Sequence, residues 1–262
     1  MKCPVLEMFV SIQGEGKYTG IPSIFIRFGG CNLRCVFGNS RCDTPYSSFE
    51  LEEPKWKEFD EFVKDFEILI EQNPNVKHVV ITGGEPMLYA EQVKQIISKY
   101  DKFIYTVETN GTLPALEGWL DSDDYYKFVD LWSISPKLST SVDHNCKFLS
   151  EEQRNHHDNI RINIKNISSY IKDIGNSYQD YQLKFVYSGR DSVVEIKDIV
   201  AKLKKVCWFS GDIDDHVMLM PEGISNDQLN NIQQECLEVC LENGWRFCDR
   251  LHIRLFGDKR GV

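Results

Sequence analysis

The sequence has no apolar run that approaches the roughly 18 residues a helix needs to cross a bilayer. Its first residues, MKCPVLEMFVSIQGEG, contain neither a long apolar stretch nor a small-residue cleavage site, so we expect no signal peptide. Internal repeats and long linkers are also missing, which favours a single domain over residues 1–262. We therefore expect a cytoplasmic protein without a membrane partner.

Positive charge is scarce as well. The 30 Lys and Arg residues stand against 40 Asp and Glu, which gives a formal net charge of −10. This balance argues against a nucleic-acid partner, although a small-molecule pocket can still be locally basic. Hydrophobic residues make up 42% of the sequence, enough for a sizeable core.

Cysteine, in contrast, is plentiful and clustered. Three of the nine cysteines, Cys31, Cys35 and Cys42, lie in the run FIRFGGCNLRCVFGNSRCDTPYS. Its glycines and polar residues are typical of a loop, and Arg34 and Arg41 would favour thiolates over thiols. Three thiolates can hold a cubane iron–sulfur cluster and leave one iron open to a small molecule, whereas four would close it. The alternative is ordinary buried thiols, which the loop character disfavours.

The other cysteines give weaker signals. Cys236 and Cys240 are one helical turn apart and Cys248 follows, so a second cluster is conceivable. Packing of an amphipathic helix explains the pair equally well, and we favour that interpretation. A reducing cytosol suits the cysteine pattern better than a disulfide framework does.

Short apolar, β-branched runs alternate with amphipathic helix patterns, which predicts an α/β sheet with crossover connections. We expect strands at Ser23–Phe28, Lys77–Thr82, Phe103–Val107, Leu131–Ser135, Gln182–Tyr187 and His216–Met220. We expect helices at Lys55–Gln72, Tyr89–Tyr100, Ser192–Lys205 and Ser225–Asn243. Residues 139–180 are polar and asparagine-rich, and we interpret them as an insertion with a short helix near Ile164–Ile174. The His156–His157 pair within them suits a surface better than a metal site.

Polar motifs follow most of these strands. They are the cysteine loop, Gly83-Gly84-Glu85-Pro86, Glu108-Thr109-Asn110-Gly111, Ser135-Pro136-Lys137 and Met220-Pro221-Glu222-Gly223. In barrels of parallel strands the chemistry gathers at the carboxyl ends, so we expect one ring of functional groups. Within it, the paired glycines would let a ligand approach the backbone, and the charge of Glu85 would suit an ammonium group.

Two segments outside these strand ends also carry polar patterns. Ser11–Gly16 is glycine-rich but lacks the Lys-Ser/Thr of a phosphate loop, so Gln13 and Glu15 suit the polar edge of a heterocycle, as does Glu108. Arg27 could bind a carboxylate or form a structural salt bridge, and both remain open. In the tail, alternation places Arg250, His252 and Arg254 on one face of a terminal strand. We expect the tail to close over the site, with a solvated edge strand as the alternative.

Taken together, SIQGEG, IRFGGCNLRC, CDTPYS, ITGGEP, ETNG, SPK, LKFV, LMPEG and RLHIRLFGDKRGV resemble the 7-carboxy-7-deazaguanine synthase family of the radical S-adenosylmethionine (radical SAM) superfamily. The cysteine loop and GGEP point only to the superfamily, whereas SIQGEG, CDT and RLH…RGV narrow the resemblance to the family. The resemblance implies an incomplete, modified radical-SAM β/α barrel and a homodimer. It also implies a 4Fe–4S cluster, S-adenosylmethionine, Mg²⁺ and a reductant such as flavodoxin or ferredoxin.

The implied activity is that of a carbon–nitrogen lyase in queuosine and 7-deazapurine biosynthesis. A 5′-deoxyadenosyl radical would take a hydrogen atom from C6 of 6-carboxy-5,6,7,8-tetrahydropterin. Ring contraction and loss of ammonia would then yield 7-carboxy-7-deazaguanine. The catalytic radical is thus expected to come from the cofactor rather than from a side chain.

The resemblance also assigns residues. It makes Cys31, Cys35 and Cys42 the cluster ligands and Thr44 the Mg²⁺ ligand. It makes Gly84, Glu85, Asn110, Ser135 and Lys137 the S-adenosylmethionine contacts. Substrate contacts would be Gln13, Gly14, Glu15, Arg27, Thr82, Glu108, His252 and Val262.

One interval departs from the superfamily pattern C-x3-C-x2-C. Gly38 stands where the third cysteine belongs, and Cys42 comes four residues later with the Asp-Thr of the family. The simplest account is an insertion from Gly38 to Arg41, because a surface loop tolerates added length cheaply. Loss of the cluster is the alternative.

Two other functions remain as alternatives. A glycyl-radical activase shares the cysteine loop but should lack SIQGEG and the RLH tail. A non-catalytic binding protein on the same scaffold is supported only by the shifted third cysteine.

Overall fold

The computed structural model describes residues 2–38, 40–50, 55–115, 129–143, 145–171, 180–207 and 211–262. Its strands are β1 Lys2–Ile12, β2 Pro22–Phe28, β3 Val36–Phe37, β4 Ser40–Arg41, β5 Lys55–Glu58, β6 His78–Gly83, β7 Ile104–Thr109, β8 Leu131–Ile134, β9 Asp180–Tyr187, β10 Val217–Pro221 and β11 Arg246–Phe247. Its α-helices are α1 Phe59–Gln72, α2 Ala90–Lys99, α3 Glu151–Ile160, α4 Ile164–Ile171, α5 Ser192–Val206, α6 Asn226–Asn243 and α7 Leu251–Phe256.

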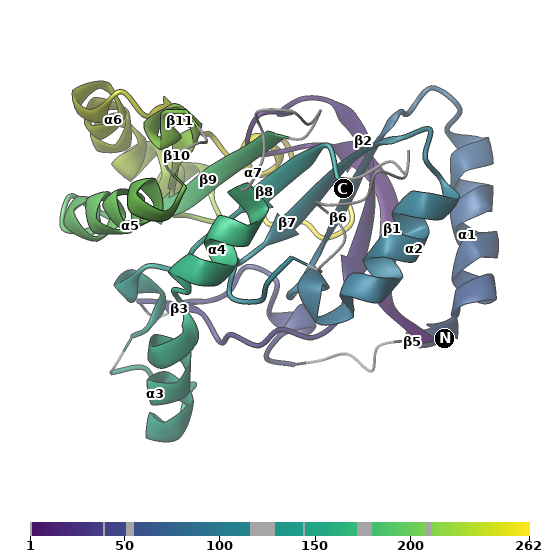
Figure 1. The fold of residues 1–262 in the computed structure, drawn as a ribbon, viewed down its shortest axis with the longest axis horizontal. Coiled ribbons are helices and arrows are strands. Elements are labelled where there is room, and N and C mark those ends of the chain that lie inside the picture. The colour runs from purple at the N-terminus through teal and green to yellow at the C-terminus, as the bar shows by residue number, and fades with distance from the viewer. Residues whose placement is uncertain are drawn as a thin grey trace.

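One large sheet organises the molecule (Figure 1). Its strands run in the order β11-β10-β9-β8-β7-β6-β2-β1-β5, and every pairing from β11 to β2 is parallel. β1 is antiparallel to β2, and β5 is antiparallel to β1. Among the described residues the two edge strands do not pair with each other, so the barrel is open, as the resemblance predicts.

The two faces of the sheet differ because successive side chains of a strand point to opposite sides. On one face, Ile26, Ile81, Val107 and Leu183 belong to the main hydrophobic core. That core also contains buried side chains of α1, α2, α4, α5 and α6, so these helices cover this face. The opposite face is richer in polar side chains, and it is this face that lines the candidate site.

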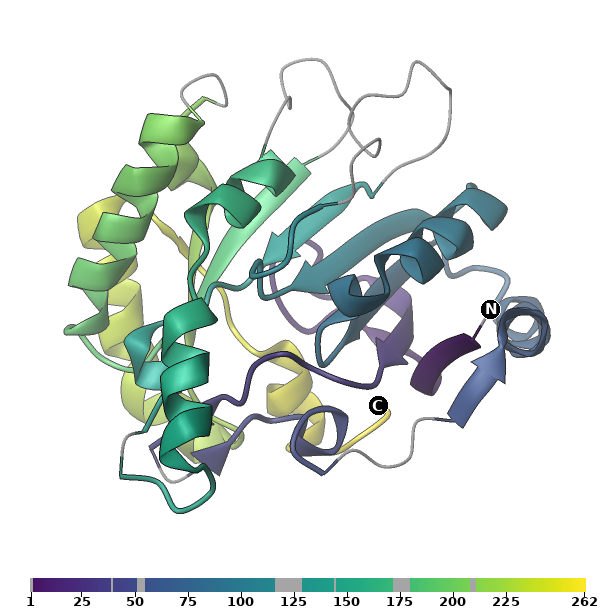
Figure 2. The same ribbon diagram turned by 60° about the horizontal axis from the view of Figure 1, so that its bottom comes forward.

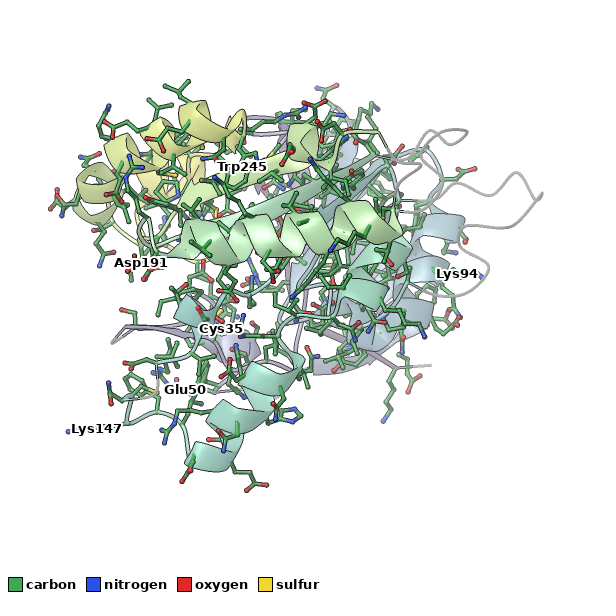
Figure 3. All side chains as sticks on the ribbon, turned by 60° about the vertical axis from the view of Figure 1, so that its left-hand side comes forward. Cys35, Glu50, Lys94, Lys147, Asp191 and Trp245 are labelled. Atoms are coloured by element: carbon green, nitrogen blue, oxygen red, sulfur yellow. The ribbon has the colours of Figure 1, made fainter. Side chains whose placement is uncertain are left out.

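A smaller unit stands apart from the main sheet. The hairpin of β3 and β4 contributes Val36 to a second core with Cys146 and Leu149, and Phe49 packs against it. Figure 3 shows Cys35 at the junction between the main body and this extension, which carries Glu50 and Lys147. The hairpin lies between the second and third cysteines of the loop and includes the proposed insertion from Gly38 to Arg41, which stays a prediction.

Most predicted elements are confirmed. All six predicted strands and four predicted helices are present, with boundary shifts of a few residues, except that Lys55–Glu58 is a strand paired with β1. Pairing with an exposed edge overrides the helical pattern there. β1 itself, which spans Lys2–Ile12, was not predicted.

The prediction of a strand at the C-terminal end is wrong, because Leu251–Phe256 forms the helix α7. Six residues are too few for periodicity to separate a strand from a helix, and Gly257, with a φ of 69°, ends this helix.

Residues 139–180 divide into two parts. α4 confirms the predicted short helix, and its Ile167 and Tyr170 lie in the main core. α3 lies outside that core, near the hairpin (Figure 1). Its His157 is buried, so the surface interpretation is wrong for this residue although it holds for His156. That the whole range is an insertion stays a prediction.

Candidate active site

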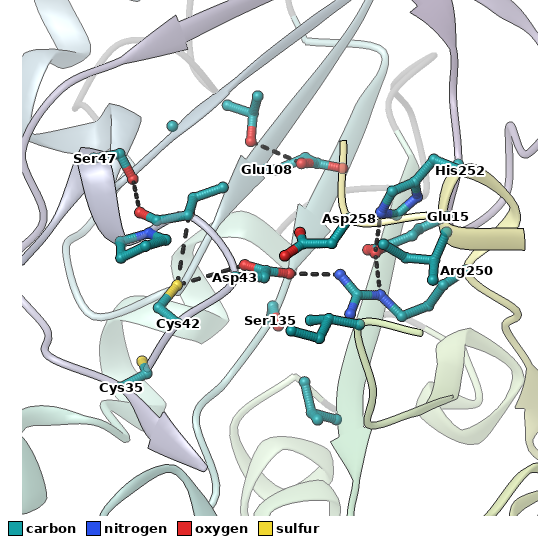
Figure 4. A pocket seen from close by; sticks show the side chains of 18 of the residues that line it. Glu15, Cys35, Cys42, Asp43, Ser47, Glu108, Ser135, Arg250, His252 and Asp258 are labelled. Atoms are coloured by element: carbon teal, nitrogen blue, oxygen red, sulfur yellow. Dashed lines mark hydrogen bonds and ion pairs between the residues drawn. The ribbon is translucent and has the colours of Figure 1, made fainter. Parts of the chain in front are cut away.

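A cavity of about 640 Å³ lies on the polar face of the sheet and at the carboxyl ends of its parallel strands. It brings together almost all the predicted site residues: Gln13, Gly14, Glu15, Arg27, Cys31, Cys35, Cys42, Thr44, Thr82, Gly84, Glu108, Asn110, Ser135, Lys137, His252 and Val262. Figure 4 shows Cys35 and Cys42 on one side and Glu15, Arg250 and His252 on the other. The predicted ring of functional groups is therefore present.

The cysteine loop folds back on itself at the end of β2. The backbone N–H of Cys42 donates to the carbonyl oxygen of Cys35 at 2.9 Å, which closes the β3–β4 hairpin between them. The N–H of Arg34 donates to Nδ1 of the buried His157 at 3.0 Å, so α3 supports the loop from behind. The lengthened interval is thus absorbed by a hairpin, and all three cysteines still reach the cavity.

Cys35 is buried, and Cys31 and Cys42 are half-buried at the cavity wall. Burial raises the pKa of Cys31 to about 12, and it raises the pKa of Cys35 and Cys42 as well. Lys137 is the cation that opposes these shifts. The expectation that Arg34 and Arg41 favour thiolates is wrong, because Arg34 donates to backbone carbonyls and Arg41 pairs with Glu50. A metal bound here would have to displace the thiol protons.

This donor set fits a cluster better than a single ion. Among the described residues, no three His, Cys, Asp or Glu side chains are close enough to hold one metal ion. A cubane cluster attaches its thiolates to different irons, so its ligands stand further apart. The pKa of Cys35 is raised mainly by its own burial and further by Cys31 and Cys42. The three sulfurs therefore lie near one another.

Gly83 and Gly84 allow the loop after β6 to touch the cysteine loop. A Cβ on Gly84 would lie 2.1 Å from the carbonyl oxygen of Gly30, and one on Gly83 would lie 2.2 Å from that of Phe28. The glycines were expected to admit a ligand to the backbone. Close contact between two segments of the chain is an additional reason for them.

Glu85, the one predicted contact missing from the cavity lining, is fully buried behind it. Its carboxylate accepts hydrogen bonds from the N–H of Met87, the hydroxyl of Thr109 and the N–H of Asn110 at 2.7–2.9 Å. Glu85 therefore fixes the loop after β7 in place. Its role as an ammonium contact stays a prediction.

Polar groups at the ends of β7 and β8 form the next part of the wall. Asn110 donates from Nδ2 to Asn32 of the cysteine loop at 3.0 Å. Lys137 donates to the hydroxyl of Ser135 at 2.8 Å. These residues lie between the cysteines and the middle of the sheet, so they can contact a molecule bound beside the cluster.

The glycine-rich loop after β1 carries the opposite wall. Gln13 donates from Nε2 to Glu108 Oε1 at 3.2 Å, and Thr82 donates to Glu108 Oε2 at 2.8 Å. Glu15 lies 2.5 Å from Lys184 Nζ and 3.0 Å from Arg250 Nε. Burial alone would raise the pKa of Glu15, but the two cations hold it below its ordinary value.

Arg27 is held by a carboxylate of the protein. Its Nε lies 2.7 Å from Glu7 Oε1, and the other oxygen of Glu7 lies 2.7 Å from Arg260 Nε. Tyr46 donates to Glu7 at 3.1 Å, and the guanidinium of Arg260 stacks 3.8 Å from its ring centroid. The salt-bridge alternative for Arg27 is thus present, on a wall that a ligand can reach.

The C-terminal segment lines the cavity, as predicted, with residues 257–262. In Figure 2 its yellow end lies beside the segment that follows Cys42, where Arg260 stacks on Tyr46. His252 packs directly against Gly14, because a Cβ added to Gly14 would lie only 2.0 Å from Nδ1 of His252. Burial lowers the pKa of His252, although Glu15 opposes this shift.

Among the described residues, no helix is both long and apolar enough to span a membrane.

Sequence reasoning missed Lys184 and the site role of Arg250. The signal for Lys184 was a lysine inside an otherwise apolar strand, LKFV, on the same face as Gln182 and Val186. Arg250 was predicted to lie on one face of a terminal strand, whereas it forms an ion pair with Glu15. Only the fold brings these three residues together.

Comparison with known proteins agrees with this arrangement. Residues 25–178 match the model of the radical SAM superfamily. The chain is 35% identical to a protein of Rhodopirellula baltica named 7-carboxy-7-deazaguanine synthase, over 98% of this chain and 88% of that one. It is 34% identical to one of the same name from Halobacterium salinarum, over 97% and 91%. The crystal structure of QueE from Escherichia coli has the same fold, with a TM-score of 0.60 and 23% identity over 96% and 95%.

Proposed function

Because this chain belongs to the 7-carboxy-7-deazaguanine synthase family of the radical SAM superfamily, we propose that it converts 6-carboxy-5,6,7,8-tetrahydropterin to 7-carboxy-7-deazaguanine with loss of ammonia. It is a radical SAM lyase of 7-deazapurine biosynthesis. One observation carries the proposal: Cys31, Cys35 and Cys42 line the same cavity as the carboxylates Glu15 and Glu108. A radical source and a site for a polar heterocycle thus share one space.

The cysteines would hold the 4Fe–4S cluster and leave one iron open for S-adenosylmethionine. When bound, the cluster and S-adenosylmethionine would supply radical chemistry for removal of a hydrogen atom from C6 of the substrate. Gly84, Asn110, Ser135 and Lys137 are the groups beside the cysteines that would bind and orient S-adenosylmethionine, with Glu85 fixing their loop.

The opposite wall would bind the pterin. Glu15 and Glu108 are hydrogen-bond acceptors that suit the N–H groups of its amino-substituted ring, and Gln13, Thr82 and His252 stand beside them. Arg27, which also pairs with its cross-strand neighbour Glu7, would bind the substrate carboxylate. The substrate would thus lie across the sheet, between its polar wall and the cysteines.

The remaining assignments are parts of the same proposal. Thr44 follows Cys42 and offers a hard oxygen ligand suited to Mg²⁺, beside the carboxylate of Asp43. The C-terminal segment, including Val262, would exclude water from the cavity. We further propose a cytoplasmic homodimer reduced by flavodoxin or ferredoxin.

The test is turnover by the anaerobically reconstituted enzyme with S-adenosylmethionine, a reductant and the pterin. The proposal predicts 7-carboxy-7-deazaguanine, identified by mass. Cleavage of S-adenosylmethionine without this product would favour a different radical enzyme, such as an activase. Absence of both the cluster and cleavage would favour the binding protein.

A further inference from the structure

Lys184 lies in the middle of β9, 5% exposed, on the polar face of the sheet. Its Nζ is 2.5 Å from Glu15 Oε2 and 3.9 Å from Glu108 Oε1. One ammonium group therefore stands between the two carboxylates that come from the glycine-rich loop and from the end of β7. Neither carboxylate is fully covered, because Glu15 keeps 14% of its side chain exposed and Glu108 keeps 24%.

The two carboxylates differ in their other partners. Glu15 has a second close cation, Arg250, at 3.0 Å, with His252 at 3.8 Å. For Glu108, Lys184 is the only ion-pair partner found among the described residues, while Gln13 and Thr82 supply neutral hydrogen bonds. Removing Lys184 would therefore leave Glu108 without a paired cation at the bottom of a half-buried pocket.

The charges explain why a lysine is tolerated here. Burial by itself would lower the pKa of Lys184, but Glu15 and Glu108 raise it above its ordinary value. The ammonium stays charged, has three donors and has no acceptor. The ammonium therefore donates to the carboxylates, and each of them keeps lone pairs that can accept hydrogen bonds from a ligand.

We propose that Lys184 is a positioning residue that holds Glu15 and Glu108 as a fixed pair of hydrogen-bond acceptors, and so selects a heterocycle with a row of N–H donors such as a 2-amino-pyrimidinone edge. This inference rests on the proposed function and deepens it, because it names the group that tunes the substrate-reading wall. Lys184 itself contacts the two carboxylates rather than the reacting carbon.

Without Lys184 the two carboxylates would lose the cation that stands between them, and Glu15 would lose one of the two cations that hold its pKa below the ordinary value. Two nearby carboxylates with one cation fewer raise each other's pKa, and a protonated carboxyl offers a donor where the ligand needs an acceptor. The groups that face this pair are Arg27 from β2, Asp43 from the cysteine loop, Cys248 after β11, and Arg250 and His252 from the tail. All remain in a Lys184 variant, so a change in pH dependence would come from the loss of Lys184.

The experiment compares Lys184→Met with Lys184→Arg in the reconstituted enzyme. Lys184→Met keeps the length of the side chain and removes the charge, whereas Lys184→Arg keeps the charge. We expect Lys184→Met to raise KM and the anaerobic dissociation constant of the pterin at least about tenfold, the order of a lost charge-assisted hydrogen bond. Iron content and S-adenosylmethionine binding should stay at the wild-type level.

Two further readouts separate positioning from a merely structural role. In Lys184→Met, kcat/KM should fall as the pH drops from about 8 to about 6, while wild type and Lys184→Arg stay nearly flat. An analogue of the pterin without its 2-amino group should bind wild type much more weakly than the pterin does, and Lys184→Met should lose most of this preference. If Lys184→Met does not fold, Lys184→Gln takes its place and the same pH profile decides.

The outcomes are distinct. If wild type turns over the pterin while the uncharged variant keeps the wild-type KM, pH profile and preference, the inference about Lys184 is wrong and the function stands. If wild type with its cluster neither binds nor converts the pterin, both the proposed function and the inference fail.

Discussion

Arg250 Nη2 lies 2.5 Å from Asp43 Oδ2, which ties the C-terminal segment to the loop that carries Cys42. The same guanidinium donates to Glu15 at 3.0 Å and to the carbonyl oxygen of Gly223 at 2.6 Å. One buried side chain thus joins the cysteine loop, the glycine-rich loop and the segment after β10. The two walls of the cavity are linked at this point.

Replacing Arg250 by Met should weaken the fold and the site together. Glu15, with 14% of its side chain exposed, would lose a cation in a largely buried place, and Asp43, with 41% exposed, would lose one nearer the solvent. Most of the expected cost of about 3 kcal/mol in the free energy of unfolding therefore comes from Glu15 and from the buried guanidinium's other partners. Urea denaturation measures this cost, and kcat/KM for the pterin should fall with it. Arg246→Met, at an exposed position of β11, is the matched control and should change the stability by less than about 0.5 kcal/mol. Equal stability of the two variants would show that the contacts of Arg250 with the three segments do not stabilise the fold.

His157 should prove important for the cluster although it lies far from it in sequence. In His157→Leu the N–H of Arg34 loses its acceptor and the hydroxyl of Ser141 loses a partner 3.0 Å away. We expect a loss of about 2 kcal/mol in stability and faster release of iron on exposure to a chelator. His156→Leu, on the exposed side of α3, should retain iron as wild type does. Similar iron release from both variants would show that α3 does not support the loop.

Stability should depend on pH through His78. Burial lowers its pKa from 6.5 to about 4, and its ring lies between the hydroxyls of Ser23 and Thr106, at 2.7 and 2.9 Å. Between these two pH values the unfolded chain binds a proton that the folded chain does not. The contribution of His78, about 3 kcal/mol, is therefore complete above pH 6.5 and is lost as the pH falls toward 4.

Urea denaturation from pH 4 to 7.5 measures this slope. His78→Gln should flatten the slope by about one proton, whereas His156→Gln, on an exposed side chain, should leave it unchanged. An unchanged slope in His78→Gln would show that this histidine titrates alike in both states.

Gly84→Ala should disrupt the contact between the two loops. The added methyl would lie 2.1 Å from the carbonyl oxygen of Gly30 and 2.8 Å from that of Ser47, and neither backbone segment can move freely. We expect a loss of at least about 3 kcal/mol. Gly20→Ala meets no atom within 4 Å and has only the strain of a φ of +89°, about 1 kcal/mol. Thermal unfolding of the two variants compares these costs, and equal midpoints would contradict the close packing of Gly84.

Much of the fold could be predicted from local sequence. The run His78-Val79-Val80-Ile81 is buried on both faces of the sheet, and such apolar runs are strong strand signals. The tail could not be predicted in the same way, because RLHIRLF satisfies strand and helix patterns alike. The sequence pattern of Lys55–Glu58 predicts the start of a helix, but in the structure these residues pair with the edge of β1.

Most of the site was also predictable, because its residues follow strands whose carboxyl ends meet. What sequence alone could not supply was the partner of each charge. Glu85 has the character of a ligand-binding residue, yet its oxygens are taken up by Thr109, Asn110 and Met87. His157 looks like a surface residue until α3 is placed against the cysteine loop. Such pairings depend on contacts between segments distant in the chain.

The most direct test of the account is cluster assembly by Cys42→Ala, with Cys146→Ala as the matched control. Cys146 is a buried thiol beside the same hairpin that does not line the cavity. After anaerobic reconstitution, wild type and Cys146→Ala should show the EPR signal of a reduced 4Fe–4S cluster that changes when S-adenosylmethionine is added. Cys42→Ala should lack this signal and hold less iron. A wild-type chain without such a cluster, or a Cys42→Ala variant that keeps it unchanged, would contradict the assignment of Cys42 as the displaced third ligand.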